Sequence, residues 1–137
     1  MDFESLLKIG TEGEVREPVT EKNIARSYGS GGLAVYATPS MVALMERACV
    51  EAVDRSLPDG FSTVGTELNV RHIAATPLGM QVRARGELLE IEGRALRFRV
   101  EAFDGAGKIG EGTHGRFIIN NEKFLQKAED KKAGPGV

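Results

Sequence analysis

The chain of 137 residues has little of what several protein classes need. It has one cysteine, Cys49, and two histidines, His72 and His114. A single cysteine excludes an intrachain disulfide and fits a reducing compartment, and so few sulfur and imidazole ligands argue against a Cys/His zinc cluster. We therefore expect no metal and no cofactor, and a chain of this length can bury enough surface to fold without either.

Long apolar runs and an excess of one charge are also missing. No apolar run approaches the roughly 20 residues of a membrane span, and the N-terminus, Met-Asp-Phe-Glu, lacks the basic and apolar regions of a signal peptide. The formal net charge is -2, from 18 basic and 20 acidic residues, whereas nucleic-acid-binding domains are usually strongly basic. These features predict a cytoplasmic protein that binds neither a membrane nor nucleic acid.

What the sequence does contain is the composition of one globular domain. Hydrophobic residues make up 41% and charged residues 28%, which are ordinary values. The 17 glycines indicate many turns and close backbone approaches. We assign residues 1–125 to a single domain and residues 126–137 to a polar, flexible C-terminal tail.

One segment has the spacing of an amphipathic helix. Thr38-Pro39 is typical of a helix start, with a hydroxyl at the N-cap and proline in the first turn. From Met41 to Leu57 apolar residues recur at helical spacing opposite a polar stripe. Pro58-Asp59-Gly60 is expected to end the helix.

The remaining segments are expected to be strands joined by short turns, followed by a short helix and a frayed end after Asn120. The expected strands cover residues 13–24, 62–73, 80–88, 96–102 and 108–119, and the third and fourth alternate clearly between apolar and polar residues. The order predicts an α+β domain with one helix on a five-stranded antiparallel sheet. Because one helix cannot cover so broad a sheet, we expect dimerisation through its edge or open face.

A glycine-rich segment resembles a nucleotide-binding motif but is better explained as a turn. Residues 105–110 match the pattern G-x-G-x-x-G, which binds dinucleotides only between a strand and a helix of a parallel unit. Here the segment joins two antiparallel strands, so we interpret it as a hairpin turn. No Walker loop, serine nucleophile elbow or zincin motif is present.

Glu46 is the most informative residue of the helix. Its neighbours on a regular helix are all apolar: Val42, Ala43, Cys49, Val50 and Val53. A carboxylate on an apolar face is costly unless it is paired or functional. Glu46 therefore either lies at the edge of that face, reaching solvent or a basic partner, or takes part in chemistry.

Each histidine also has two explanations. By strict alternation His72 lies on the same strand face as Leu68 and Val70. There it is either a hydrogen-bonded core histidine or a general base near pH 7. His114 lies among small residues, which either let a ligand approach or mark a β-bulge.

Thr38 either caps the helix or faces a substrate at the helix N-terminus, where backbone amides and the helix dipole favour an oxyanion or a phosphate. Thr38 and Glu46 are eight residues apart, which is about 12 Å along a helix. They share one site only if the helix starts late or another group bridges them. Basic residues that could meet an anionic ligand are Arg71, Arg94, Lys108 and Arg116.

Four separated motifs resemble fluoroacetyl-CoA thioesterase and its relatives. After Ala37-Thr38 they are MVALMERAC at 41–49, VGT at 64–66, VRHIAATP at 70–77 and IGEGTHGR at 109–116. The likeness spans residues 10–125. It implies a hotdog fold, in which a curved antiparallel sheet wraps one long helix. It also implies hydrolysis of a short acyl-CoA thioester in a homodimer with sites at the subunit interface; whether two dimers pair into a tetramer stays open at this point.

The resemblance also implies individual site residues. The family's catalytic threonine, glutamate and histidine fall on Thr38, Glu46 and His72, and its substrate-contacting glycine and arginine fall on Gly65 and Arg116. The family's aromatic segment over the acyl group is replaced here by GSGGLAV at residues 29–35. We therefore expect an acyl group other than fluoroacetyl.

Within this resemblance the chemical roles stay open. His72 would act as general base on water or on the Thr38 hydroxyl, and Glu46 would either orient His72 or attack the carbonyl. An enoyl-CoA hydratase of the same fold usually needs a histidine near the helix start, and none precedes His72. A non-catalytic acyl-CoA-binding protein would keep Arg116 and the pocket, and a structural subunit would give Glu46 no purpose.

Overall fold

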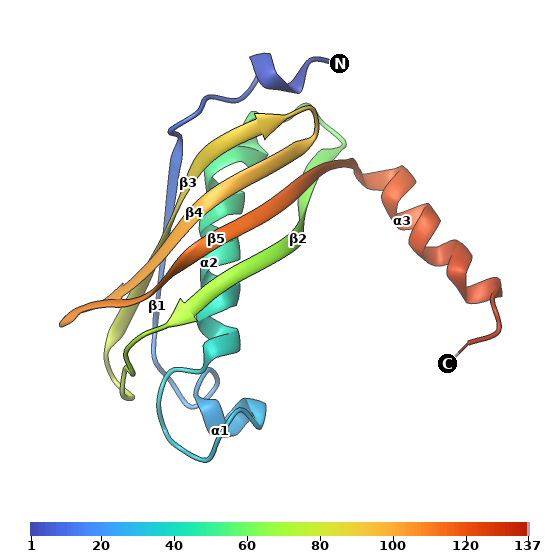
Figure 1. The fold of residues 1–137 in the computed structure, drawn as a ribbon. Coiled ribbons are helices and arrows are strands. Elements are labelled where there is room, and N and C mark those ends of the chain that lie inside the picture. The colour runs from blue at the N-terminus through green and yellow to red at the C-terminus, as the bar shows by residue number, and fades with distance from the viewer. Residues whose placement is uncertain (137) are drawn as a thin grey trace.

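One long helix lies in the concave face of a curved five-stranded sheet (Figure 1). The computed structural model describes residues 1–136. Its strands are β1 (Glu12–Pro18), β2 (Phe61–His72), β3 (Gln81–Glu92), β4 (Ala95–Asp104) and β5 (Gly107–Asn120). Its helices are α1 (Ala25–Tyr28), α2 (Thr38–Val53) and α3 (Asn121–Glu129), with 3-10 turns at Phe3–Ser5, Asp54–Ser56 and Asp130–Ala133.

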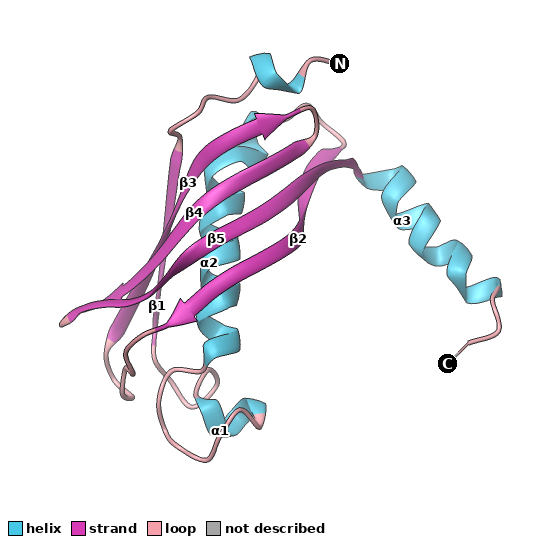
Figure 2. Cartoon of the chain, in the orientation of Figure 1, coloured by secondary structure: helices cyan, strands magenta, loops and turns pink. Residues whose placement is uncertain are grey.

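The sheet is antiparallel throughout, in the order β1-β3-β4-β5-β2 (Figure 2). The predicted α+β arrangement is therefore confirmed. Residues 104–107 form the β4–β5 hairpin turn, as predicted, and Asp104 Oδ1 accepts hydrogen bonds there from the N–H groups of Ala106 (2.8 Å) and Gly107 (3.2 Å). No helix within residues 1–136 is long and apolar enough to cross a membrane.

The hydrophobic core lies between α2 and the sheet, mainly against β1 and β3. Its largest buried side chains include Met41, Leu44, Met45, Val82, Leu88 and Phe98. Gly86 lets the helix lie directly on β3, because a Cβ atom at that position would be 2.7 Å from Cys49 Sγ. Burial raises the pKa of the Cys49 thiol to about 12, so this cysteine stays a thiol and packs as a small apolar residue.

Two predicted elements are longer than the observed ones. The pattern over residues 13–24 predicts one strand, but β1 ends at Pro18, because proline has no N–H for the ladder. A turn follows, in which the Thr20 N–H donates to Asn23 Oδ1 (2.8 Å). The helix predicted to reach Leu57 is regular only to Val53.

The C-terminal segment begins with a helix. Asn120 caps α3, since its side-chain oxygen accepts a hydrogen bond from the Lys123 N–H (3.0 Å). This helix runs across the predicted boundary between residues 125 and 126, so that division stays a prediction. Val137, the last residue of the predicted tail, lies outside the described residues.

The two edges of the sheet differ. β1 has seven residues, carries three glutamates and one arginine, and ends in proline, features that discourage pairing with another strand. β2 at the opposite edge has twelve residues. Residues 65–69 in its middle are all exposed, although neighbouring strand residues point to opposite faces. Both faces of β2 are therefore open around Leu68.

Candidate active site

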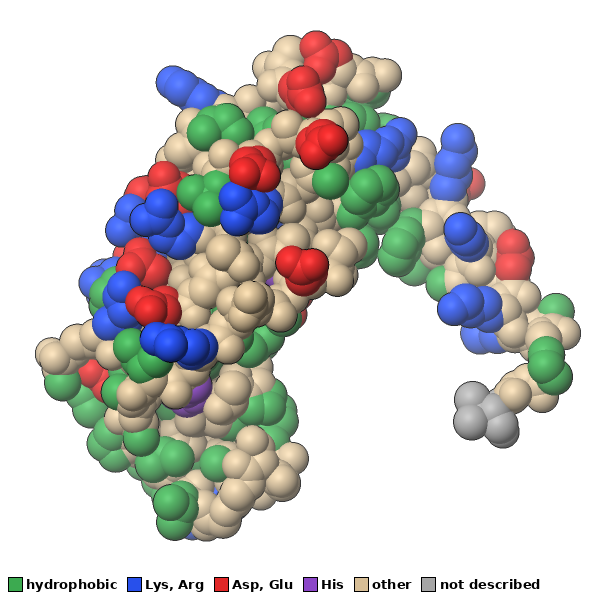
Figure 3. All heavy atoms as spheres, in the orientation of Figure 1, with side chains coloured by type: hydrophobic (Ala, Val, Ile, Leu, Met, Phe, Trp, Pro, Cys, Tyr) green, Lys and Arg blue, Asp and Glu red, His purple; other side chains and the backbone are tan. Residues whose placement is uncertain are grey.

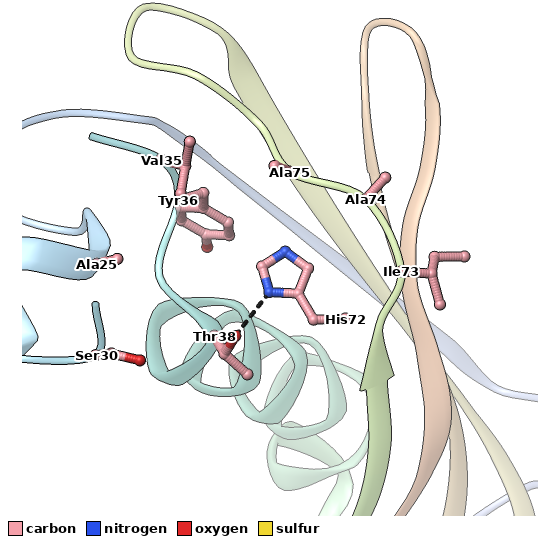
Figure 4. Close-up of a pocket in the computed structure, with 9 residues that line it drawn as sticks. All are labelled: Ala25, Ser30, Val35, Tyr36, Thr38, His72, Ile73, Ala74 and Ala75. Atoms are coloured by element: carbon pink, nitrogen blue, oxygen red, sulfur yellow. Dashed lines mark hydrogen bonds between the residues drawn. The ribbon is translucent and has the colours of Figure 1, made fainter. Parts of the chain in front are cut away.

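Thr38 and His72 form a pair at the N-terminus of α2. Thr38 Oγ1 lies 2.8 Å from His72 Nδ1, and Figure 4 shows the two side chains pointing toward each other. Thr38 is the first residue of the helix rather than its cap; Ala37 occupies the cap position and no side chain caps the helix there. The Thr38 hydroxyl thus bonds to a residue of β2 instead of its own helix, contrary to the capping interpretation.

A pocket of about 310 Å³ opens beside this pair, lined by Ala25, Ser30, Val35, Tyr36, Thr38, His72, Ile73, Ala74 and Ala75 (Figure 4). Two segments far apart in sequence hold its walls together, because the Tyr36 N–H donates to Thr76 O (2.8 Å). The Tyr36 hydroxyl donates to Glu17 (2.6 Å). Burial, with the Glu17 contact, raises the pKa of Tyr36, so its hydroxyl stays protonated. Tyr36 therefore has a structural role in the pocket wall and takes no part in acid–base chemistry.

His72 is held in its neutral form. Burial lowers the pKa of its imidazole below the ordinary 6.5, and a polar backbone contact at Ala74 opposes this effect only in part. Within residues 1–136 Nε2 is buried and has no hydrogen-bond partner of normal geometry. A neutral imidazole with one nitrogen on a hydroxyl has the properties of a general base.

Glu46 lies about two turns further along α2, in a second cluster. Its Oε2 is 3.3 Å from Arg116 Nη1 and 3.9 Å from His114 Nε2. The Glu46 side chain is 37% exposed and the Arg116 side chain only 6%. The carboxylate thus sits at the edge of the apolar helix face beside a basic partner, and it still reaches a cavity of about 250 Å³ lined by Glu46, Gly65, Thr66, Glu67, Leu68 and His114.

Arg116 is almost fully occupied by protein contacts. Nε and Nη2 donate to the hydroxyl and carbonyl oxygens of Thr63, each at 2.8 Å. Thr63 is held in turn by Asp54, whose carboxylate accepts from the Thr63 hydroxyl (2.6 Å). Nη1 approaches both Glu46 and His114. A buried guanidinium with this many partners is suited to fixing a carboxylate in place.

His114 joins this cluster with a defined tautomer. Nδ1 is 2.8 Å from the carbonyl oxygen of Glu67, which can only accept, so Nδ1 carries the hydrogen. Nε2 then accepts from Arg116 Nη1 (3.1 Å). Burial is the main cause that lowers the pKa of His114. Both ring nitrogens of His114 form hydrogen bonds, so His114 supports Arg116. The sequence contains one indication of this role: His114 and Arg116 are two residues apart on a strand and therefore share one face.

Gly65 leaves room for the Glu46 carboxylate. A Cβ atom at this position would lie 2.8 Å from Glu46 Oε2 and 3.2 Å from His114 Cε1. Contacts under 3 Å force something to move, so glycine keeps the carboxylate where Arg116 holds it. The predicted substrate-contacting residue therefore borders the carboxylate directly.

The five predicted site residues thus fall into two separate clusters in one chain. Thr38 and His72 form the first, while Glu46, Gly65 and Arg116 form the second. His72 and Gly65 are seven residues apart on β2, or about 23 Å along an extended strand. Glu46 therefore does not orient His72 within one chain. Of the other basic candidates, Arg71 pairs with Glu111 (3.5 Å) and Lys108 with Glu101 (2.8 Å).

Comparison with known proteins agrees with this fold. The family model of fluoroacetyl-CoA-specific thioesterases (FlK) matches residues 19–122. The fluoroacetyl-CoA thioesterase of Streptantibioticus cattleyicolor is 48% identical over 97 residues, which are 71% of this chain and 70% of that protein. The solved structure of fluoroacetyl-CoA thioesterase FlK has a TM-score of 0.86 at 39% identity and covers 91% of this chain and 97% of its own.

Two further solved structures extend the likeness. A hypothetical protein of Thermus thermophilus, described as a thioesterase superfamily member, has a TM-score of 0.85 at 29% identity, over 92% of this chain and 93% of its own. A hot-dog-like protein from Thermanaerovibrio acidaminovorans has a TM-score of 0.88 at 23% identity, over 98% and 99% of the two chains. At this identity the likeness to the Thermanaerovibrio protein shows the fold alone. This chain therefore has the hotdog fold.

Proposed function

Since the chain belongs to the family of fluoroacetyl-CoA-specific thioesterases, we propose that it hydrolyses an acyl-CoA thioester to the free acid and CoA. The observation that carries this proposal is the 2.8 Å contact between Thr38 Oγ1 and a neutral His72 on the wall of a pocket at the N-terminus of α2. An activated hydroxyl or water beside a helix N-terminus suits attack on a carbonyl carbon.

The start of α2 is suited to stabilise the oxyanion of that reaction. The first intrahelical hydrogen bond runs from the Met41 N–H to Ala37 O (3.0 Å). The N–H groups of Thr38 and Ser40 precede it, and Pro39 has none. Two amides and the positive end of the helix dipole would face the negative charge that develops on the thioester oxygen.

Glu46 supplies the second reactive group of the proposed site. Arg116 and Gly65 hold its carboxylate toward an open cavity, where it would orient water or attack the carbonyl. Arg116 then acts mainly by fixing Glu46, and Gly65 by allowing the substrate to approach. When water attacks directly, His72 accepts its proton and passes it to the leaving thiolate of CoA. When Glu46 attacks, the thiolate leaves as an anhydride forms, and His72 takes the proton from the water that then hydrolyses this anhydride.

A homodimer paired along β2 would bring the two clusters together. In an antiparallel pair of β2 strands, residue numbers opposite each other have a constant sum. Residues directly opposite each other point to the same face, so the two-fold axis passes through a residue pair. An axis at Asn69 puts His72 opposite Thr66 of the partner subunit, next to Gly65 of the partner subunit, and hence near Glu46 of the partner subunit. The exposed middle of β2 and its free outer edge support this pairing. Each dimer would then hold two composite sites.

The acyl group is proposed to differ from fluoroacetyl. The pocket wall is built from small side chains such as Ala25, Ser30 and Ala74. In the segment before Thr38, a Cβ atom added at Gly32 would meet no heavy atom within 4 Å. Because residues 29–35 carry no aromatic side chain, this segment would leave more room over the acyl group, which favours a short acyl group larger than two carbons.

Thiol release from a panel of CoA esters tests the proposed reaction. We expect turnover of at least one class among acetyl, fluoroacetyl, longer alkanoyl and aryl esters, with the preferred chain above two carbons. Tight binding of CoA esters by the folded dimer, without thiol release across the panel, would contradict hydrolysis and favour an acyl-CoA-binding protein.

Mixed dimers test the composite site. Glu46→Gln and His72→Asn each inactivate both sites of their own homodimer. In a heterodimer of the two variants, both substitutions fall in one composite site and the other site is intact. Random mixing after reversible dissociation should therefore restore about a quarter of the wild-type activity. No recovery from a proven heterodimer would contradict the shared site.

A further inference from the structure

A second groove lies where α3 leaves the sheet, outside both clusters. It has a volume of about 260 Å³ and is lined by Phe61, Arg94, Phe117, Ile118, Ile119, Asn120, Lys123, Phe124 and Lys127. Figure 3 shows basic side chains along α3 and apolar ones at its junction with the sheet. Phe117 and Phe124 are 40% and 43% exposed as residues, so their side chains are accessible to a ligand.

The basic side chains of this groove are held on a defined frame. The Asn121 N–H donates to Gly60 O (2.8 Å), and the Ser62 hydroxyl donates to Asn121 Oδ1. These contacts tie the first turn of α3 to the start of β2. Lys123 and Lys127 are four residues apart on α3, so they share one helix face.

The groove is positive although the chain as a whole is slightly acidic. Among the described residues no carboxylate lies within 4 Å of the cationic atoms of Arg94, Lys123 or Lys127, whereas Arg97 pairs with Glu90 at 2.6 Å. The Arg94 guanidinium lies 5.2 Å and 5.9 Å above the rings of Phe3 and Phe61. Three cations beside aromatic rings suit a ligand that combines phosphates with a flat base.

The groove is also at the right distance from the proposed reaction centre. Phe61 and Gly65 are four residues apart on β2, which is about 13 Å along the strand. The pantetheine arm of coenzyme A has about as many backbone bonds as four extended residues, so it spans about 14 Å. A thioester carbonyl beside Glu46 would therefore put the nucleotide of the same molecule at this groove.

We propose that this groove binds the 3′-phosphoadenosine diphosphate end of the CoA thioester, with Lys123, Lys127 and Arg94 on the phosphates and Phe117 and Phe124 against the adenine. The inference rests on the proposed hydrolysis for the position of the thioester. It assigns substrate recognition to α3, a segment that carries none of the reacting groups.

The kinetic test compares a CoA ester with the same acyl group on N-acetylcysteamine, which lacks the nucleotide. For Lys123→Ala/Lys127→Ala we expect KM for the CoA ester to rise at least about tenfold, because two charge-assisted phosphate contacts are lost. The kcat value and the KM for the truncated ester should stay unchanged. An equal effect on both esters, or on neither, would overturn the proposal. Lys131→Ala/Lys132→Ala, outside the groove, is the matched control.

A binding test separates this inference from the proposed reaction. Adenosine 3′,5′-bisphosphate is titrated calorimetrically into wild type and both double variants, with no hydrolysis involved. Binding by wild type and the control, weakened at least about tenfold in Lys123→Ala/Lys127→Ala and by added salt, supports the groove even if no ester is hydrolysed. Equal binding by all three proteins, or no binding by wild type, would overturn the proposal. The oligomeric state of each protein is measured alongside. Loss of binding that follows only from a changed oligomeric state of Lys123→Ala/Lys127→Ala would also overturn it.

Discussion

The two clusters of the proposed site are built in opposite ways. Arg116 and His114 are buried, and their polar atoms are satisfied by Thr63, Glu67 and each other. Thr38 is exposed, makes one side-chain contact and faces an open pocket. The buried cluster is complete within one chain and holds a carboxylate still. The pair at the helix start lacks a second partner, so a substrate or another subunit has to complete it.

The largest expected effect comes from removing the charge that the buried cluster holds. Glu46→Gln keeps an oxygen for Arg116 and should leave the fold intact, but kcat should fall at least about a thousandfold because the reacting carboxylate is gone. Thiol release with the preferred ester measures this. Glu51→Gln, an exposed glutamate on the same helix, is the control and should stay near wild type. Turnover near wild type in Glu46→Gln would refute the assigned role.

The next largest effect is a difference in protein stability between substitutions in the two clusters. Arg116→Met leaves buried acceptors of Thr63 and His114 without their donor, while Glu46, at 37% exposed, can turn to solvent. It should lower the free energy of unfolding by about 1–3 kcal/mol. Thr38→Ala removes a contact of an exposed side chain and should cost less than about 0.5 kcal/mol, while lowering kcat. Urea denaturation measures both. Equal losses of stability would show that the two clusters are not built differently.

A smaller effect tests how tightly Gly65 borders the carboxylate. Gly65→Ala puts a methyl group 2.8 Å from Glu46 Oε2, and the partly exposed carboxylate can move away. We expect kcat to drop about tenfold with little change in stability, since an ångström of misplacement costs activity. Gly105→Ala in the β4–β5 turn, where the added Cβ atom would make only an ordinary contact of 3.5 Å with Met80 Cε, is the control and should leave kcat unchanged.

The smallest effect is a shift of the pH profile. The neutral form of His72 is the proposed base, and burial lowers its pKa below 6.5. Protonation removes that base, so kcat/KM should fall as the pH is lowered, with its midpoint at the lowered pKa, below pH 6.5. A profile of kcat/KM in wild type measures it. A midpoint above pH 6.5 would contradict a buried His72 as the base.

Much of the fold could be predicted because its signals are local. Helical spacing, alternating strands and an Asp-Gly turn depend on residues a few positions apart, and each was found where expected. The errors were at boundaries, as where Pro18 ends β1. Glu46 could be identified from the sequence because it is a carboxylate that interrupts the apolar face of an amphipathic helix.

The partners of the site residues were decided only by the tertiary structure. The Thr38–His72 contact joins residues 34 positions apart, and the Glu46–Arg116 pair joins residues 70 positions apart. The first joins α2 to β2 and the second joins α2 to β5, so the register of β2 against β5, which a bulge at Gly65/Glu67 shifts, sets how the two contacts lie relative to each other. By itself the sequence determined which faces are apolar and which residues could react. Packing decided which of them meet, because a strand register is set by contacts along the whole sheet.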